Sequence, residues 1–336
     1  MTDGSARVLR AGVVGLGMMG RNHVRVWDDA VDGVRLVAVS DPDPEALARA
    51  THDRSIRGYA DPAAMFAEEE LDLVSVVTPT SLHRDVVLAA LASGAHVLVE
   101  KPIAATRDEA EEMIAAAREA GRILTVGHIE RFNPAILELR RRLAAGELGR
   151  VFEITATRLG PFPARIRDVG VVLDLAPHDL DVMRFLLGSD PVRVYAETER
   201  RIHTEHEDLF VGVLKFANGA VGTLDINWLT PTKKRTLTVT GERGMYAADY
   251  IAQDLVFHAN PADASVAEGE MVRRHVERRE PLQVELEAFA TAVREGGAAP
   301  VDPHEAMVAL LLARTMVEAA RSGGVVSGAA LEAVLA

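Results

Sequence analysis

The most informative chemical group in this sequence is a lysine that follows an apolar run. Residues 96–100 form this run, and Glu100, Lys101 and Pro102 stand at its end. Only four of the 37 lysines and arginines are lysines, so arginine supplies most of the bare positive charge. Lysine differs from arginine because its pKa can be moved and its proton given up. Lys101 is either a surface lysine paired with Glu100 or a reactive group, and its place at the carboxyl end of a predicted strand favours the second role.

A glycine-rich segment near the N-terminus predicts a dinucleotide site. An apolar strand leads into Gly15-x-Gly17-x-x-Gly20, and a helical pattern follows. The three glycines permit a tight turn, the approach of a pyrophosphate and close packing of a helix whose N-terminus favours phosphate. A second strand ends at Asp41, where an acidic residue suits the two free ribose hydroxyls of NAD and would repel the 2′-phosphate of NADP. We therefore predict NAD as the cofactor.

Composition favours a soluble enzyme and argues against several other classes of protein. The chain has 336 residues, a formal net charge of −13 and a pI near 5.4, which suits neither nucleic acid nor an anionic membrane as main partner. It contains no cysteine, which removes disulfides, thiolate metal sites and cysteine nucleophiles. No apolar stretch approaches the roughly 18 residues of a membrane span, and the N-terminus lacks the pattern of a secretory signal. We expect a cytoplasmic protein.

Residues 1–128 alternate between predicted strands and helices. The strands are nearly continuous apolar runs, which are typical of a parallel sheet buried on both faces. We therefore expect an α/β fold in which residues 1–128 form an NAD-binding Rossmann domain with a doubly wound parallel sheet.

Residues 129–336 have a different pattern, and we expect a second α/β domain that binds substrate and forms oligomers. Strand-like runs with alternating polarity follow one another, and Asn218-Gly219 is a strong hairpin signal. They predict a large, open, mostly antiparallel sheet of about five or six strands, with a polar surface excursion at residues 261–280. The runs cover residues 150–159, 192–199, 209–216, 220–228 and 235–240. A sheet face without helices of its own needs a cover, which predicts self-association.

A second constellation lies in this domain, where Asp174 precedes His178 by one helical turn. Proline is accepted in the first turn of a helix, so the pattern predicts a helix that begins at Pro177 and ends at Gly188. A histidine beside a carboxylate is a tunable general base near neutral pH; the alternative is a capping aspartate and an ordinary, partly buried histidine. The histidines show no ligand pair on one face, so we predict no metal site.

Taken in order, these motifs resemble those of the Gfo/Idh/MocA family of NAD(P)-dependent sugar and cyclitol dehydrogenases. Thr78-Pro79, followed by His83, adds to the resemblance, which covers the whole chain. It implies a C-terminal domain whose open sheet forms homodimers or homotetramers, and hydride transfer between a sugar carbon and the nicotinamide.

The resemblance also implies roles for individual residues. The catalytic set falls on Lys101, Asp174 and His178. The implied cofactor contacts are Gly15, Gly17, Met18, Met19, Gly20, Asp41, Thr78, Pro79, His83, Glu100 and Lys101.

Residues 126–135 are similar to a subgroup that oxidises the 3-hydroxyl of UDP-N-acetylglucosamine. Arg131, Arg158, Arg165 and Arg167 offer fork donors suited to a diphosphate or a sugar acid, although each could equally be a solvated surface residue. We expect Arg131 and Arg165, together with the catalytic set, to bind substrate. Three hypotheses remain: a nucleotide-sugar dehydrogenase, the same chemistry on inositol or a free sugar, and a regulator that binds NAD and sugar without catalysis.

Overall fold

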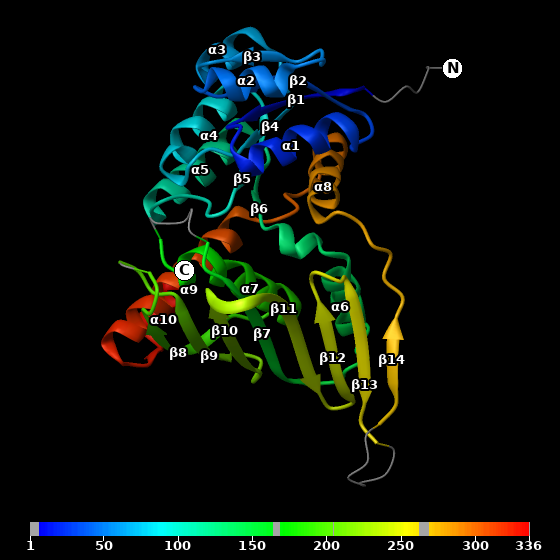
Figure 1. Cartoon of the computed structure of the whole chain (residues 1–336), viewed down its shortest axis with the longest axis vertical. Coiled ribbons are helices and arrows are strands. Elements are labelled where there is room, and N and C mark those ends of the chain that lie inside the picture. Colours follow the sequence, from blue (N-terminus) through cyan, green and yellow to red (C-terminus); the bar gives the residue numbers. More distant parts are fainter. Residues whose placement is uncertain (1–6, 164–168, 204, 262–268, 336) are drawn as a thin grey trace. The chain divides into compact units, whose positions relative to one another are not determined.

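The computed structural model describes residues 7–163, 169–203, 205–261 and 269–335. The chain folds into two compact units (Figure 1), one of Met1–Ile129 with Glu280–Met307 and one of Glu130–Arg279 with Val308–Ala336. These units differ from the expected domains, 1–128 and 129–336, because Glu280–Met307 belongs to the first unit. Within the described ranges, no helix is long and apolar enough to cross a membrane.

The first unit is built on a six-stranded sheet. Its order is β3-β2-β1-β4-β5-β6, and all neighbouring strands run parallel. The strands are β1 (Leu9–Val14), β2 (Val34–Ser40), β3 (Arg57–Tyr59), β4 (Leu73–Val76), β5 (His96–Glu100) and β6 (Leu124–Gly127). The strand order reverses between β1 and β4, and ligands bind outside the carboxyl ends of strands at such a reversal. The predicted doubly wound parallel sheet is confirmed.

Local capping residues explain where several helices of this unit begin. The side chains of Asp43, Asp61 and Thr106 accept backbone hydrogen bonds at the starts of α2, α3 and α5. Such caps satisfy N–H groups that have no partner inside the helix. The helices are α1 (Met18–Asp29), α2 (Pro44–Thr51), α3 (Pro62–Glu68), η1 (Thr80–Leu82), α4 (His83–Ala92) and α5 (Arg107–Ala120). The short helix η2 (Ile129–Phe132) begins at the last residue of this segment and continues into the second unit.

Helix α8 (Pro281–Glu295) completes the core of the first unit. Leu282, Leu286 and Phe289 are buried in the same apolar cluster as Trp27, and the rings of Phe289 and Trp27 meet edge-on with centroids 6.5 Å apart. Gln283 of α8 also donates a hydrogen bond to the Ala30 carbonyl, some 250 positions away in the chain. Because the partners of α8 are so distant in sequence, no local pattern could assign this helix to the first unit.

The second unit is built on a nine-stranded sheet. Its order is β14-β13-β12-β11-β7-β10-β9-β8-β15, with β7 and β10 parallel and the other pairs antiparallel. The strands are β7 (Val151–Pro161), β8 (Pro191–Glu199), β9 (Leu209–Phe216), β10 (Val221–Asn227), β11 (Leu229–Gly241), β12 (Gly244–Asp249), β13 (Asp254–Ala259), β14 (Met271–Arg274) and β15 (Val326–Ser327). The mostly antiparallel character is confirmed.

The predicted size of this sheet, five or six strands, is wrong. Strands β12 and β13 follow β11 after tight turns, and β14 lies inside residues 261–280, which were expected to be a surface excursion. The edge strand β14 carries Arg273 and Arg274, and charges of this kind protect an exposed edge but obscure the strand pattern. The Asn218-Gly219 hairpin is confirmed, with β9 and β10 paired antiparallel and Gly219 at φ +91°.

Helices pack against one face of the second sheet. Phe210, Leu214 and Phe216 of β9 point into the main apolar cluster with residues of α6, α7 and α9. The alternate residues Val211 and Val213 are 45% and 42% exposed, so the opposite face is open to solvent. The helices are α6 (Pro134–Ala144), α7 (Val171–Leu187), α9 (Pro303–Ser322) and α10 (Ala329–Leu335).

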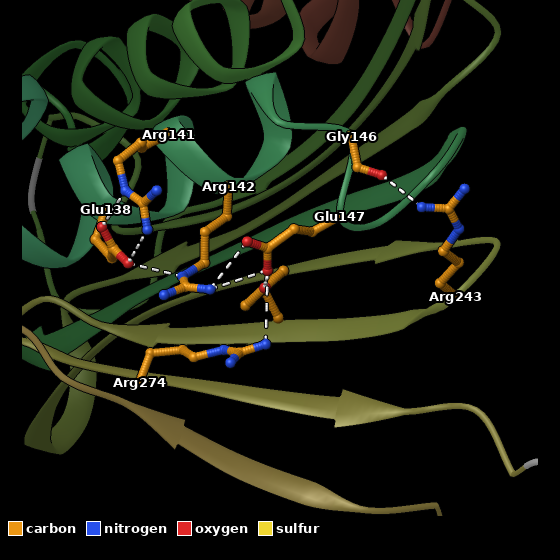
Figure 2. Close-up of polar contacts among 8 residues, drawn as sticks. Glu138, Arg141, Arg142, Gly146, Glu147, Arg243 and Arg274 are labelled. Carbon is orange, nitrogen blue, oxygen red and sulfur yellow. Dashed lines mark hydrogen bonds and ion pairs between the residues drawn. The ribbon is translucent and has the colours of Figure 1, made fainter.

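A polar network ties the segment after α6 to this sheet (Figure 2). Arg142 donates to both carboxylate oxygens of Glu147 at 3.0 Å, and Arg274 of β14 lies 3.5 Å from Glu147 Oε2. The hydroxyl of Tyr246 on β12 donates to the same oxygen at 2.6 Å. The Tyr246 hydrogen bond, followed by that of Arg142, holds the pKa of Glu147 below its ordinary value although burial opposes the shift.

Removal of the Tyr246 hydroxyl tests this network. We expect Tyr246→Phe to lower the free energy of unfolding by about 1 kcal/mol at neutral pH, because a hydrogen bond to a charged group is lost in a partly exposed place. The depressed pKa of Glu147 adds stability above the pKa of the unfolded chain, and this stability is lost as the pH falls through the folded pKa. The difference in stability between the two proteins, measured by denaturant titration, should therefore shrink as the pH falls below the ordinary carboxyl pKa.

The matched control is Tyr195→Phe. The Tyr195 hydroxyl also bonds a glutamate, Glu197, but at an exposed position where water competes. We expect no measurable change in the unfolding midpoint, and equal destabilisation by the two variants would contradict the proposed importance of Glu147.

Candidate functional site

A cavity of about 650 Å³ lies at the carboxyl ends of β1 and β4 in the first unit. It contains Gly15, Gly17, Asp41, Thr78 and Pro79, which sequence predicted as cofactor contacts. The full lining consists of Val14, Gly15, Gly17, Ser40, Asp41, Pro42, Ala60, Asp61, Pro62, Val77, Thr78, Pro79, Leu82 and Val86. Most of this wall is apolar, as expected of a pocket for a planar base with a few polar anchors.

The backbone of the glycine loop fits a pyrophosphate. Gly15 has φ +94°, and a Cβ on this residue would lie 2.5 Å from the Val77 carbonyl oxygen. A Cβ on Gly20 would lie 1.9 Å from the Gly15 oxygen, so α1 must pack against the loop without a side chain there. A Cβ on Gly17 would meet nothing within 4 Å, and no side chain caps α1 at this residue. The open position at Gly17 leaves room at the N-terminus of α1, where phosphate oxygens can accept hydrogen bonds from the first N–H groups of a helix.

Asp41 holds the loop and also lines the cavity. Its Oδ2 accepts a hydrogen bond from Leu16 N at 2.6 Å, and its Oδ1 accepts one from Asp43 N at 2.9 Å. A carboxylate has about four acceptor positions, so capacity for a ribose hydroxyl remains. The two loop methionines differ: Met18 is 57% exposed at the start of α1, whereas Met19 packs against the core of the unit.

The carboxylate of Glu100 fixes the backbone at Lys101. Glu100 Oε1 lies 3.0 Å from Nε2 of His23, which is completely buried in α1, and Oε2 accepts a hydrogen bond from Lys101 N at 3.2 Å. A Cβ on Gly127 would lie only 3.0 Å from the Glu100 carboxyl carbon, so glycine makes room for this group. Sequence analysis missed His23; its place three residues after Gly20, on the helix that packs against the sheet, was the available signal.

His83 is not among the residues that line the cavity. Its Nε2 is 2.9 Å from the Thr78 carbonyl and its Nδ1 is 3.0 Å from the Pro102 carbonyl, so the ring joins the ends of β4 and β5. The side chain is buried, and burial lowers its pKa despite these carbonyl contacts. A neutral ring can donate to only one of the two oxygens. The structure therefore gives His83 a supporting place, in contrast to the direct cofactor contact that sequence predicted.

In the second unit, Asp174 and His178 lie on α7 four positions apart and are both partly buried. The predicted start of this helix at Pro177 is wrong, because α7 begins at Val171 and Pro177 lies inside it. The additional turns are capped from elsewhere in the chain: Glu207 accepts a hydrogen bond from Val171 N through its carbonyl at 2.9 Å. Sequence gives no local sign of a partner so distant.

The expected substrate residue Arg131 is instead part of a buried ion pair. Its Nε and Nη2 donate to the two oxygens of Asp181 at 2.7 and 2.6 Å, and both side chains are almost fully buried. Arg158 forms a similar pair with Asp179, at 2.7 and 2.9 Å, and also donates to Glu130 at 2.9 Å. These guanidinium groups bind the protein's own carboxylates.

Nearby carboxylates favour the charged form of Arg158. Burial opposes a charge on Arg158, but the carboxylates of Asp179 and Glu130 outweigh it and hold the Arg158 pKa above its ordinary value. Arg165 and Arg167 lie outside the residues that the structure describes. Over the described ranges, no group of three or more His, Asp or Glu side chains is arranged to hold a metal ion.

Known families match both parts of the chain. Residues 9–128 match the family described as "Oxidoreductase family, NAD-binding Rossmann fold", and residues 136–247 match the "GFO/IDH/MocA C-terminal domain".

Individual relatives span most of the chain. It is 32% identical over 289 residues to a UDP-N-acetylglucosamine 3-dehydrogenase of Acidithiobacillus ferrooxidans, covering 85% of this chain and 88% of the relative. A solved structure of that enzyme superposes with a TM-score of 0.85 at 29% identity, covering 94% of this chain and 98% of the other. The chain is also 27% identical over 328 residues to a scyllo-inositol 2-dehydrogenase of Bacillus subtilis, covering 94% of this chain and 95% of the relative.

A stability measurement distinguishes a structural Arg131 from a substrate ligand. We expect Arg131→Ala to lower the free energy of unfolding by about 3–5 kcal/mol, because it leaves the charge of Asp181 buried without its main partner. Chemical denaturation followed by circular dichroism measures this loss.

The control for this experiment is Arg141→Ala, which removes a guanidinium paired with Glu138 at the surface. We expect no measurable change there, because exposed ion pairs contribute little. An Arg131→Ala protein with wild-type stability and a raised KM for substrate would overturn the structural role and restore the predicted one.

Proposed function

The chain belongs to the Gfo/Idh/MocA oxidoreductase family, an NAD-binding family of sugar and cyclitol dehydrogenases, and on this premise we propose a nucleotide sugar as its substrate. It is an NAD-dependent dehydrogenase. The proposed reaction is oxidation of the 3-hydroxyl of UDP-N-acetylglucosamine, or of a related nucleotide sugar, to a ketone. The observation that carries this proposal is the 32% identity to a UDP-N-acetylglucosamine 3-dehydrogenase over 85% of the chain.

We assign the chemistry to Lys101, Asp174 and His178. Bound NAD supplies a nicotinamide ring that accepts the hydride from the sugar carbon. His178 takes the hydroxyl proton as general base, and Asp174, one turn before it on α7, orients the imidazole and supports its charged form. Lys101 stabilises the oxygen as negative charge develops on it, or shares the proton relay.

The surroundings of Lys101 support this assignment. Glu100 is held on one side by His23 and bonds the Lys101 N–H on the other, so the backbone that carries the lysine is fixed. A rigid backbone favours catalysis because the reacting groups need not be ordered in the transition state.

A second candidate is a cyclitol dehydrogenase of the same family. Arg131 and Arg158 pair with Asp181 and Asp179, which removes two of the cations that sequence had offered to a diphosphate. The scyllo-inositol relative spans 94% of the chain, so an uncharged polyol is the competing substrate class.

We also propose that the open face of the nine-stranded sheet joins copies of the chain into a homodimer or homotetramer. This face carries the exposed side chains Val211 and Val213 and a row of threonines in which Thr155 and Thr223 hydrogen-bond at 2.7 Å. Exposed apolar side chains on a broad sheet face that is not covered by helices favour contact with a second copy of the sheet.

Substrate screening tests the proposed reaction. We expect NAD with UDP-N-acetylglucosamine to yield NADH and a product that has lost two hydrogens, identified by mass spectrometry and located at the 3-position by NMR. Free N-acetylglucosamine, myo-inositol and scyllo-inositol are the comparison substrates. Turnover of an inositol without turnover of any nucleotide sugar would transfer the assignment to the second candidate.

Variants of the proposed catalytic residues test the mechanism. We expect Lys101→Ala and His178→Ala each to lower kcat by roughly 10²–10⁴-fold, the usual contribution of a positioned acid or base, while NADH binding measured by fluorescence persists. Lys101→Arg should not restore activity, because arginine keeps its proton.

His52→Ala is the control, since its side chain is exposed at the surface. Near-normal kcat for both Lys101→Arg and His178→Ala, in an assay limited by chemistry, would refute the acid–base assignment.

A further inference from the structure

The charges around the cofactor cavity come from two strand ends. Of the residues that the structure describes in its lining, Asp41 and Asp61 are the charged ones. Asp41 follows β2 and Asp61 follows β3, and these strands are adjacent and paired as far as Ser40 and Tyr59. The Asp41 N–H donates to the Tyr59 carbonyl at 3.0 Å, so the two chain segments leave the sheet side by side.

Asp61 faces the cavity from a fixed backbone. Its Oδ1 accepts a hydrogen bond from Ala63 N at 2.9 Å and so caps α3. Its neighbours Ala60 and Pro62 line the same wall, which places the carboxylate on the cavity side of this turn.

Two arginines on the neighbouring elements β3 and α2 are paired with other carboxylates. Arg57 on β3 donates to Glu68 at 2.6 Å and to Glu69 at 3.0 Å. Arg49 on α2 lies 3.4 Å from Glu45 and 3.7 Å from Asp43. A phosphate group at the edge of the cavity would therefore meet two carboxylates before it met an arginine fork, which is the partner that NADP sites use.

We infer that Asp61 is a second determinant of the preference for NAD over NADP, acting by charge repulsion alongside Asp41. Asp41 serves two purposes, because both of its oxygens also hold backbone N–H groups of the glycine loop and of the α2 turn. Its replacement disturbs the loop for both cofactors and leaves the charge of Asp61 in place. Replacement of Asp61 by a neutral residue therefore weakens the discrimination between NAD and NADP without disturbing the glycine loop.

A matched pair of variants separates the charge of Asp61 from its role as a helix cap. Asp61→Asn removes the charge but keeps a good helix cap, since asparagine caps about as well as aspartate. Asp43→Asn is the control: Asp43 caps α2 in the same way through Glu45 N, and it lies outside the cavity lining. Asp61→Ser offers a second neutral cap in case the amide is poorly tolerated.

Direct binding of NADH and NADPH, measured by fluorescence without sugar substrate, gives the readout. We expect Asp61→Asn and Asp61→Ser to lower the Kd for NADPH roughly tenfold, the effect of removing one like charge at short range in a partly solvated pocket. The Kd for NADH should change less than about threefold, and Asp43→Asn should change the ratio of the two Kd values less than either Asp61 variant does. Salt screens repulsion between exposed charges. Added salt should therefore lower the ratio of the NADPH Kd to the NADH Kd more in the wild-type protein than in Asp61→Asn.

Three results would overturn the inference. The first is an unchanged ratio of NADPH to NADH affinity in both Asp61 variants. The second is an equal change in Asp43→Asn, and the third is a loss of NADH affinity that leaves the ratio as it was. Since no sugar takes part in the measurement, a failure here is separate from a failure of the proposed substrate.

Discussion

Two bidentate arginine–aspartate pairs fix the position of helix α7. The position of His178, the proposed general base on this helix, depends on them. Asp179 and Asp181 follow His178 on the helix, and Arg158 and Arg131 bind them from β7 and from η2. Charges so deeply buried cost solvation free energy, and only close paired geometry offsets that cost. A rotation of α7 would break at least one pair and leave a buried charge uncompensated, so the helix has one favourable setting.

This constraint changes the meaning of residues 129–133. Their similarity to a nucleotide-sugar subgroup suggested direct contact with substrate, but the side chains of Glu130 and Arg131 hold β7 and α7 in place, and Asn133 caps α6. A sequence motif can thus mark a group of enzymes through the framework around a site. The guanidinium groups of Arg131 and Arg158 are paired with Asp181 and Asp179 in this framework.

Local signals carried most of what sequence could predict. The glycine spacing, the acidic residue after β2 and the Glu100-Lys101-Pro102 run are each recognised from neighbouring residues in the chain. Gly15, Gly17 and Asp41, from the first two of these signals, line the cavity. The errors had long-range causes: α7 is capped by Glu207, and Arg131 finds its partner 50 positions away. Edge strand β14 was not predicted because its sequence, two apolar residues followed by two arginines, shows no alternation of apolar and polar residues. Partners so far apart leave no periodic trace.

The placement of α8 has a consequence for the order in which the protein can be made. The nucleotide-binding unit takes Leu282, Leu286 and Phe289 into its core, and the Thr125 hydroxyl donates to the Val301 carbonyl at 3.0 Å. These segments leave the ribosome only after strands β7 to β14 of the second unit have been synthesised. Although domains generally fold as units from the N-terminus, the first unit here must wait with an unfinished apolar face around Trp27. The apolar face around Trp27 therefore stays exposed to solvent while most of the chain is being synthesised. It is covered only when α8 has left the ribosome and packs against it.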